Sequence, residues 1–472
     1  MNIILIVSDT LRYDYLGCYG NTMVHTESID RLARESLVFD KAYIASFPTI
    51  PHRRDLHTGR YTFTYSDWSF DGRESNLPWD EIILSESLRQ AGYTTMLIAD
   101  TPHLIRDRHG FDRGFNGWLW IRGQEADRFM TNPTKESEEL GDIVGRQYLM
   151  NVQMRRFESD YFVSQTMQAA EKWLELNYDK HEKFFLYIDT FDPHEPWDPP
   201  KWYADMYDPK WKGGPVPGMA YAPKRITVAS QLSDEELNHL RALYAGEVTL
   251  VDRWVGRLLQ KIEDLGLYED TVVVFTTDHG TYLGEHNYIG KTPVLYEEVA
   301  HIPLIIRMPD SAKDIRGRCD SLVQPPDLMP TFLEIAGAKI PNSVQGKSLL
   351  PLIRGEEEQI RDIAVSSGSL MTTYWITVTS SKWSLIVVKE GAKKHLEDAV
   401  QKGLYRSEMS APVASELYDL TTDTNQSRNL YEENPEVAEI LQSKMLCFLK
   451  SLGTREDLLS SWRKTQSSSK GL

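Results

Sequence analysis

Apolar and polar positions alternate along the chain with two different periods. Short runs in which nearly every residue is apolar or β-branched predict buried strands at 2–7, 94–99, 183–191, 271–277 and 302–308. Between them, apolar residues that recur every three or four positions predict helices, as at 29–36, 83–92 and 235–266. Continuous apolar strands separated by helices indicate an α/β fold, in which a large, mostly parallel sheet is sandwiched by helices.

The pattern changes near residue 364. Four short strands follow closely, at 363–369, 374–380, 383–389 and 416–420, and a helix is expected near 435–450. Strands so close in sequence favour antiparallel pairing. We therefore expect a large α/β domain at 1–363 and a small C-terminal α+β domain with antiparallel strands and a helix at 364–472.

Charge and cysteine content narrow the function. The 472 residues carry a net charge of -17, which argues against nucleic acid as a partner because a phosphate backbone requires a basic surface. Three cysteines without short spacing fit neither a disulfide framework nor a zinc site. No apolar run of about 18 residues predicts a membrane span, and no signal peptide is recognised. We expect a soluble cytoplasmic protein without a membrane partner; its oligomeric state is not predicted.

Polar residues follow four of the predicted strands, where open parallel sheets bind their ligands. They are Asp9 after the first strand, Asp100, Thr101 and His103 after the second, Asp192 and His194 after the third, and Asp278 and His279 after the fourth. Any one of these residues alone is better explained as a helix cap or a structural histidine. Their coincidence at four strand ends favours a functional site.

Two carboxylates and one imidazole in this group suit a divalent cation. Asp9, Asp278 and His279 are the candidate ligands. The nitrogen ligand favours Mn, Zn or Fe, while Ca or Mg is possible.

The stretch "TIPHRRDLHTG" (49–59) predicts a helix that begins at the same site. Pro51 suits a first helical turn, and Thr49 lies where the chain enters it. A helix N-terminus attracts anions, and Arg53, one turn further on, has a guanidinium that can bind a tetrahedral oxyanion. The alternative is that Thr49 is an N-cap and Arg53 a surface charge.

These motifs, taken in order, resemble the sulfatase family of the alkaline phosphatase superfamily, and in particular its arylsulfatases and phosphonate monoester hydrolases. The similar stretches are "NIILIVSDTLRYDYLGCYG", "TIPHRRDLHTGRY", "FDPHEPW" and, most specifically, "VVVFTTDHGTYLGEHNYIGK". The resemblance implies an alkaline phosphatase-like fold and one divalent metal ion on Asp9, Thr49, Asp278 and His279. It also implies Thr49 as nucleophile with Arg53 as its partner, and it places around the substrate's oxygens and leaving group His194, His286 and Lys291.

The chain also departs from the family's pattern. Sulfatases carry Cys or Ser, oxidised to formylglycine, at the position of Thr49, so no formylglycine is expected here. Thr10 stands where many members have a second metal aspartate. Asp100 and Pro102 replace the lysine and histidine of a Gly-Lys-Trp-His motif, and His103 or Thr101 are the candidate substitutes in substrate binding.

The sequence thus predicts a metal-dependent ester hydrolase with a small anionic substrate. Threonine nucleophiles in the superfamily act on phosphorus, which favours a phosphate diester, phosphonate or phosphate ester cleaved through Thr49. Three alternatives remain open at this point: a sulfuric ester hydrolase without formylglycine, a phosphotransferase, and a non-catalytic binding protein.

Overall fold

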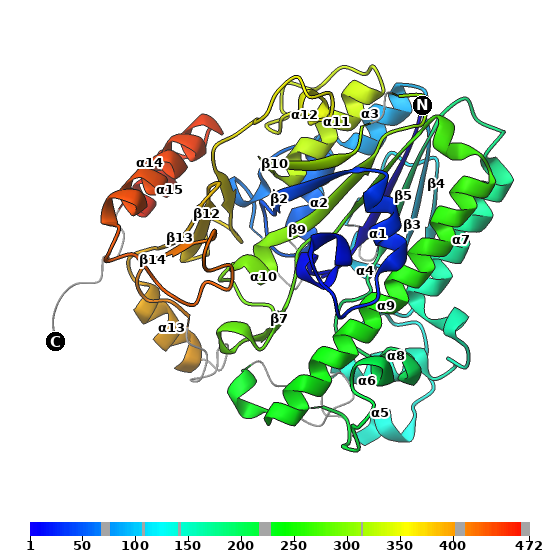
Figure 1. Ribbon diagram of the computed structural model, residues 1–472, viewed down its shortest axis with the longest axis horizontal. Coiled ribbons are helices and arrows are strands. Elements are labelled where there is room, and N and C mark those ends of the chain that lie inside the picture. Colours follow the sequence, from blue (N-terminus) through cyan, green and yellow to red (C-terminus); the bar gives the residue numbers. More distant parts are fainter. Residues whose placement is uncertain are drawn as a thin grey trace.

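The computed structural model describes residues 1–67, 76–105, 109–139, 143–216, 228–312, 315–401 and 411–463. An eight-stranded sheet forms its centre (Figure 1). In spatial order the strands are β10 (Gly317–Val323), β2 (Leu37–Tyr43), β9 (His301–Arg307), β6 (Thr271–Thr276), β1 (Asn2–Ser8), β5 (Phe184–Thr190), β3 (Thr94–Ala99) and β4 (Gly117–Trp120). All five strands expected from apolar runs are present, which confirms the predicted sheet.

Strand direction within the sheet is parallel with one exception. β1 pairs in parallel with both β5 and β6, whereas β9 runs antiparallel to its neighbours β6 and β2. β2, β4 and β10 were not expected from the apolar pattern. Because β2 and β10 are parallel to each other and share the direction of β1, the carboxyl ends of seven strands meet at one edge.

Helices cover both faces of the sheet, as predicted. Successive residues of β1 enter two separate cores, with Ile3 and Leu5 on one face and Ile4 and Ile6 on the other. The first face is covered by α2 (Thr49–Thr58), α3 (Leu84–Gln90), α4 (Pro102–Ile105), α11 (Leu328–Ile335) and α12 (Leu350–Ile353). The second is covered by α1 (Glu27–Arg34), α7 (Phe162–Asn177), α8 (Lys201–Tyr207) and α9 (Asp234–Asp264).

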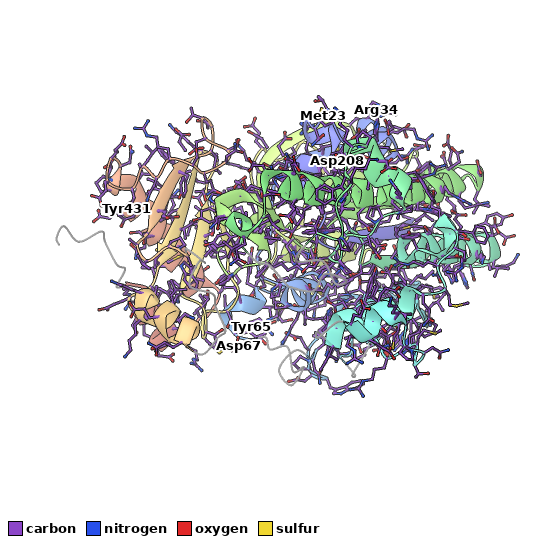
Figure 2. All side chains as sticks on the ribbon, turned by 90° about the horizontal axis from the view of Figure 1, so that it is seen from below. Met23, Arg34, Tyr65, Asp67, Asp208 and Tyr431 are labelled. Carbon is purple, nitrogen blue, oxygen red and sulfur yellow. The ribbon has the colours of Figure 1, made fainter. Side chains whose placement is uncertain are left out.

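The two helical layers are visible from two directions. In Figure 1, α1 and α9 lie in front of the sheet and α2 lies behind it. Figure 2 turns the molecule edge-on: Arg34, at the end of α1, lies at the upper surface, and Tyr65, which follows α2, lies at the lower one. On this face α2 packs against α3 and α11, and all ten of its residues are buried.

A second sheet lies at one end of the molecule (Figure 1). Its four antiparallel strands are β11 (Ala364–Ser366), β12 (Trp375–Thr379), β13 (Trp383–Val388) and β14 (Glu416–Asp419). One face packs against α14 (Pro435–Ser451) and α15 (Glu456–Arg463), and the other contributes Trp375 and Ile386 to the core of the large sheet. The expected antiparallel C-terminal unit is confirmed, while the boundary at residue 364 stays a prediction.

The remaining elements are short connections or insertions. They are α5 (Lys135–Glu139), α6 (Ile143–Val152), β7 (Tyr282–Leu283), β8 (Ile289–Gly290), α10 (Glu297–Ala300) and α13 (Ala392–Gln401). Among the described residues, no helix combines the length and the apolar composition that a bilayer crossing requires.

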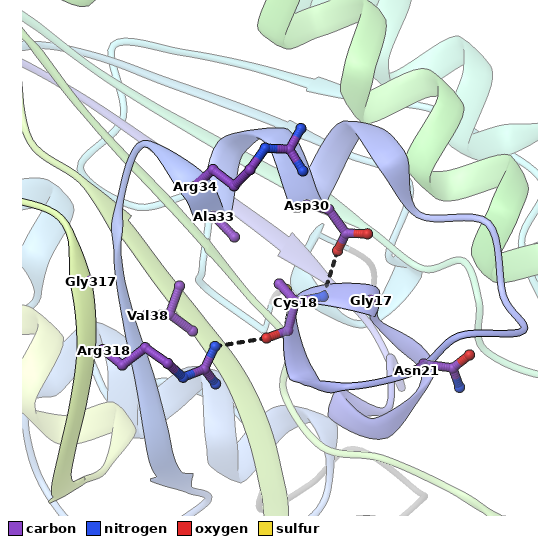
Figure 3. A pocket seen from close by; sticks show the side chains of 9 residues that line it. All are labelled: Gly17, Cys18, Asn21, Asp30, Ala33, Arg34, Val38, Gly317 and Arg318. Carbon is purple, nitrogen blue, oxygen red and sulfur yellow. Dashed lines mark hydrogen bonds between the residues drawn. The ribbon is translucent and has the colours of Figure 1, made fainter.

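A cavity of about 500 Å³ lies beside the first residues of β2 and β10. Figure 3 shows its wall, where Arg318 donates to the carbonyl of Cys18 at 2.8 Å and the Cys18 N–H donates to Asp30 at 2.7 Å. This is the edge of the sheet opposite to the one where Asp9 and Asp278 meet. The cavity is therefore separate from the polar cluster described next.

Candidate active site

Three predicted metal ligands converge at the carboxyl ends of adjacent strands. Asp9 directly follows β1, and Asp278 and His279 follow β6. All three side chains are fully buried, and ligand atoms from each lie within 4.8 Å of one another. Among the described residues they form the one group of carboxylates and imidazoles that meets this criterion.

Thr10 orients both carboxylates of this group. Its hydroxyl donates to Oδ1 of Asp9 at 2.5 Å, and its backbone N–H donates to Oδ1 of Asp278 at 2.9 Å. The Thr10 φ of 63° is unusual for a β-branched residue. Thr10 thus supports the two aspartates and leaves their Oδ2 atoms facing the interior of the cluster.

His279 presents one nitrogen to the same interior. Its Nδ1 lies 2.9 Å from the carbonyl of Gly280, and this contact assigns the proton to Nδ1 and the lone pair to Nε2. Burial lowers the pKa of His279 to about 4, although the charge of Asp278 opposes the shift. A neutral imidazole with a free Nε2 is the form that binds a metal.

The donor set fits a divalent cation. Oδ2 of Asp9 is buried and accepts no hydrogen bond, so it is available as a ligand. Burial, followed by the charge of Asp278, raises the pKa of Asp9 well above its usual value, whereas Arg53 and Lys291 lower it. A cation bound beside Asp9 and Asp278 would therefore stabilise the ionised forms of both carboxylates.

Thr49 lies at the first position of α2, as the sequence predicts. Its Oγ1 is 3.5 Å from Nε2 of His279, and the residue is 6% exposed. Asp55, in the later part of α2, ties the chain before the helix to the chain after it, because its carboxylate accepts from the N–H and hydroxyl of Ser46 and from the N–H of Thr62. Gly59, with a φ of 65°, ends the helix at its C-terminus, where its N–H donates to the carbonyl of Asp55.

Arg53 is engaged entirely by protein groups. Its Nε and Nη2 donate to the two carboxylate oxygens of Asp189 at 2.9 and 2.8 Å, and Nη1 donates to Oδ2 of Asp278 at 2.5 Å. Nη2 also lies 3.0 Å from Oδ2 of Asp9, as an ion pair without hydrogen-bond geometry. Arg53 is therefore neither a surface charge nor free to bind an oxyanion in this arrangement.

Lys291 and His194 form a second polar group at the site. The Lys291 ammonium donates to Nε2 of His194, whose Nδ1 lies 2.6 Å from the carbonyl of Glu195. Burial lowers the pKa of His194 to about 4. The charge of Lys291 also lowers this pKa, whereas the charge of Glu195 raises it. His194 is thus neutral at pH 7, and Lys291, 18% exposed in its side chain, supplies the positive charge.

Two carboxylates flank this pair. Oε2 of Glu195 is 3.6 Å from Nζ of Lys291, and Oε2 of Glu125 is 3.0 Å from Nε2 of His103. Burial would raise the pKa of Glu125, but His103, His194 and Lys291 reverse this and lower it. His103, a predicted substrate contact, is consequently paired with an acid from the β4–α5 connection.

The structure gives Thr101 a different role from the expected substrate contact. Thr101 is fully buried, and its hydroxyl donates to Oδ1 of Asp189 at 2.5 Å. His286 contacts Tyr296, on which its ring is stacked at 3.7 Å, and its Nε2 is 3.5 Å from Glu298. A substrate contact by His286 stays a prediction.

Sequence reasoning missed Asp189, Tyr187 and Glu125. Asp189 lies inside β5, whereas the predicted site residues follow the ends of their strands. A carboxylate within the apolar run "FFLYIDTF" was a detectable signal, because a buried charge requires a partner. Glu125 lies in an irregular segment and gave no such signal.

Comparison with known proteins identifies the family. The sulfatase family model matches residues 1–338. The chain belongs to the sulfatase family. An arylsulfatase from Clostridium perfringens is 27% identical over 395 residues, which cover 76% of this chain and 80% of that protein. Sulfatase-family enzymes are ester hydrolases that bind a divalent metal ion, and the predicted enzyme class is confirmed at this level.

Two further similar proteins are not named as sulfatases. A multifunctional alkaline phosphatase superfamily protein from Trinickia caryophylli is 25% identical over 406 residues, which cover 75% of this chain and 77% of that protein. The crystal structure of a phosphonate monoester hydrolase from Agrobacterium radiobacter matches with a TM-score of 0.72 at 20% identity, covering 96% of both chains. The structural match confirms the alkaline phosphatase-like fold of this sulfatase-family member.

The cluster predicts specific metal binding. Chelator-treated protein should take up about one equivalent of Mn²⁺, and Asp9→Asn should weaken this binding at least tenfold because it neutralises a candidate ligand. Isothermal titration calorimetry measures both. Asp14→Asn is the control, since Asp14 pairs with Arg12 and is 39% exposed in its side chain. Equal affinities of Asp9→Asn and wild type would contradict the assignment.

Proposed function

We propose that this sulfatase-family hydrolase cleaves a phosphorus ester, a phosphate diester or phosphonate monoester, with Thr49 as its nucleophile. The observation that carries the proposal is the position of the Thr49 hydroxyl, at the N-terminus of a buried helix and 3.5 Å from Nε2 of His279. Threonine has no route to the aldehyde hydrate on which the formylglycine mechanism depends. The nucleophile available at this position is therefore the unmodified hydroxyl.

The proposed cofactor is one divalent cation on Asp9, Asp278 and His279, with Mn, Zn or Fe favoured by the imidazole and Ca or Mg possible. When bound, such a cation lowers the pKa of a nearby hydroxyl and stabilises negative charge on ester oxygens. The Thr49 hydroxyl lies beside the free Nε2 of His279, at 3.5 Å, whereas the Thr10 hydroxyl is already engaged as a donor to Oδ1 of Asp9. No formylglycine takes part.

In the first proposed step, Thr49 Oγ1 loses its proton to solvent and forms a bond to phosphorus. The bond between phosphorus and the leaving oxygen breaks with its electron pair, and this oxygen takes a proton. Lys291 is the proposed donor, because His194 has a pKa of about 4 and carries no proton on Nε2 at pH 7. His194 then acts by holding the ammonium in place.

In the second step, water cleaves the phosphothreonine. The oxygen of water forms the new bond to phosphorus and gives up a proton, while the Thr49 Oγ1–phosphorus bond breaks with its electron pair and Oγ1 takes that proton. Lys291 regains from solvent the proton that it gave to the leaving group. The backbone N–H groups of Thr49 and Ile50 are the ones proposed to face the negative charge that develops in both steps, because Pro51 has no N–H and His52 donates to the carbonyl of Pro48. Arg53 contributes by neutralising the buried carboxylates behind Thr49.

The charges around Lys291 favour a monoanionic substrate. Glu195 lies 3.6 Å from the ammonium, and Glu125 adds a second negative charge. Family members carry lysine at the position of Asp100, so the site lacks that positive charge; burial, followed by the charge of Asp192, raises the pKa of Asp100 well above its usual value. A dianionic phosphate monoester would be repelled by Glu195 and Glu125. Phosphate diesters, phosphonate monoesters and sulfate monoesters are all monoanions and fit this criterion.

A sulfuric ester hydrolase is the second candidate. The names of most relatives favour it, among them the arylsulfatase from Clostridium perfringens and an N-acetylglucosamine-6-O-sulfatase from Bacteroides thetaiotaomicron. In that case Thr49 would attack sulfur, and a sulfothreonine would have to be hydrolysed without the collapse that formylglycine permits.

A panel of nitrophenyl esters separates the two candidates. The manganese-loaded enzyme should prefer a phosphate diester or phosphonate monoester over a phosphate monoester and a sulfate monoester. Thr49→Ala should lower kcat/KM on order of 10³-fold or more, because the nucleophile is lost. Thr58→Ala is the control, since the Thr58 hydroxyl donates within α2 to the backbone carbonyl of Arg54. A Thr49-dependent preference for the sulfate ester would favour the second candidate.

The role of Lys291 predicts a dependence on the leaving group. Lys291→Met should lower the rate for phenyl esters with poor leaving groups about 10²-fold, and for nitrophenyl esters much less, because good leaving groups need no proton. The slope of log kcat/KM against leaving-group pKa measures this. An unchanged slope in the variant would exclude Lys291 as the donor.

A further inference from the structure

Arg53 connects the candidate metal ligands to a third carboxylate, that of Asp189. The guanidinium of Arg53 and the carboxylates of Asp9, Asp189 and Asp278 are all fully buried. Asp189 accepts a bidentate pair of hydrogen bonds from Arg53, at 2.8 and 2.9 Å, whereas Asp9 and Asp278 each contact one nitrogen of the guanidinium. The paired geometry makes Asp189 the principal anchor of the guanidinium.

The position of Asp189 is fixed on all sides. Its backbone lies inside β5, in register with Val7 of β1 and Ala99 of β3. Its Oδ1 also accepts from the hydroxyl of Thr101 at 2.5 Å, and its Oδ2 accepts from the hydroxyl of Tyr187. Burial, then the charge of Asp189, raises the pKa of Tyr187 well above 10, so this hydroxyl keeps its proton and donates.

The charges of the cluster balance only when Asp189 is included. Three carboxylates and one guanidinium leave two negative charges, which one divalent cation would neutralise. Without Asp189, a divalent cation would leave one positive charge in a fully buried site, and buried uncompensated charge is strongly unfavourable. The guanidinium would also be held by Asp9 and Asp278 alone, the carboxylates that a metal requires.

We propose that Asp189 is a positioning residue for metal binding: it anchors Arg53 beside Asp9 and Asp278 and supplies the negative charge that allows the guanidinium and a divalent cation to share these two carboxylates. The inference rests on the metal site proposed above. It assigns Asp189 an effect on cation affinity, which a residue that only holds β5 in place would not have.

The test is a charge-balance cycle with Mn²⁺ as the probe, measured by calorimetry on chelator-treated full-length protein. Asp189→Asn should weaken Mn²⁺ binding at least tenfold, as substitutions behind metal ligands commonly do. Adding Arg53→Gln should restore affinity to within about threefold of wild type, because the double variant has the wild-type net charge. Arg53→Gln alone should bind Mn²⁺ more tightly than the double variant.

Asp252→Asn is the matched control. Asp252 is also a buried carboxylate, but it accepts from the N–H groups of Ser28 and Ile29 at the start of α1, on the other face of the sheet. Its substitution should leave Mn²⁺ affinity unchanged even if the protein becomes less stable. Circular dichroism establishes that each variant is folded before titration.

Each outcome decides the inference. Wild-type affinity in Asp189→Asn, or no recovery in the double variant, would overturn it. If Asp189→Asn does not fold, the comparison moves to the Arg53→Gln background, where equal affinity with and without Asp189 would overturn it. If Asp9→Asn also binds Mn²⁺ with wild-type affinity, the proposed metal site itself is wrong. If Asp9→Asn loses binding but Asp189→Asn does not, the metal site is supported and the proposed role of Asp189 is wrong.

Discussion

A guanidinium buried among three carboxylates organises the candidate active site. Asp189, Asp9 and Asp278 come from β5, β1 and β6, which are adjacent in the sheet, and Arg53 comes from α2. Removing one partner of a buried ion pair typically costs about 3–5 kcal/mol, so the sheet edge and α2 are strongly coupled. Because Thr49 lies one helical turn before Arg53, this ion cluster also fixes the distance between the Thr49 hydroxyl and His279.

The positive and neutral groups of the site then have separate tasks. His279 and His194 each use Nδ1 on a backbone carbonyl, and burial keeps both imidazoles neutral, so their Nε2 atoms act as acceptors. Positive charge is carried by the fully buried Arg53 and by Lys291, whose side chain is 18% exposed. This arrangement favours Lys291 as the proposed proton donor to a leaving group, where the sequence had left His194 and Lys291 as equal candidates.

Much of the architecture could be predicted because the central strands are buried on both faces and therefore read as continuous apolar runs. The direction of β9 could not be predicted, since apolar runs carry no information on strand direction. The strand β2 was missed because its apolar pattern is interrupted by Asp40 and Lys41. At the site, the convergence of Asp9, Asp278 and His279 was predictable from their places after strands. The hydrogen bond from the Thr101 hydroxyl to Asp189 was not predictable, because the two residues are 88 positions apart in the sequence.

The central claim is that unmodified Thr49 becomes covalently bound to phosphorus during turnover. Mass spectrometry of the peptide that contains Thr49, after rapid acid quench of the manganese-loaded enzyme with a phosphate diester, tests this directly. We expect the mass of unmodified threonine before turnover, a substituted phosphoryl group on Thr49 during turnover, and no such adduct in Thr49→Ala. Turnover of the ester with Thr49 unmodified at every time point, at an enzyme concentration that would reveal the adduct, would contradict the account.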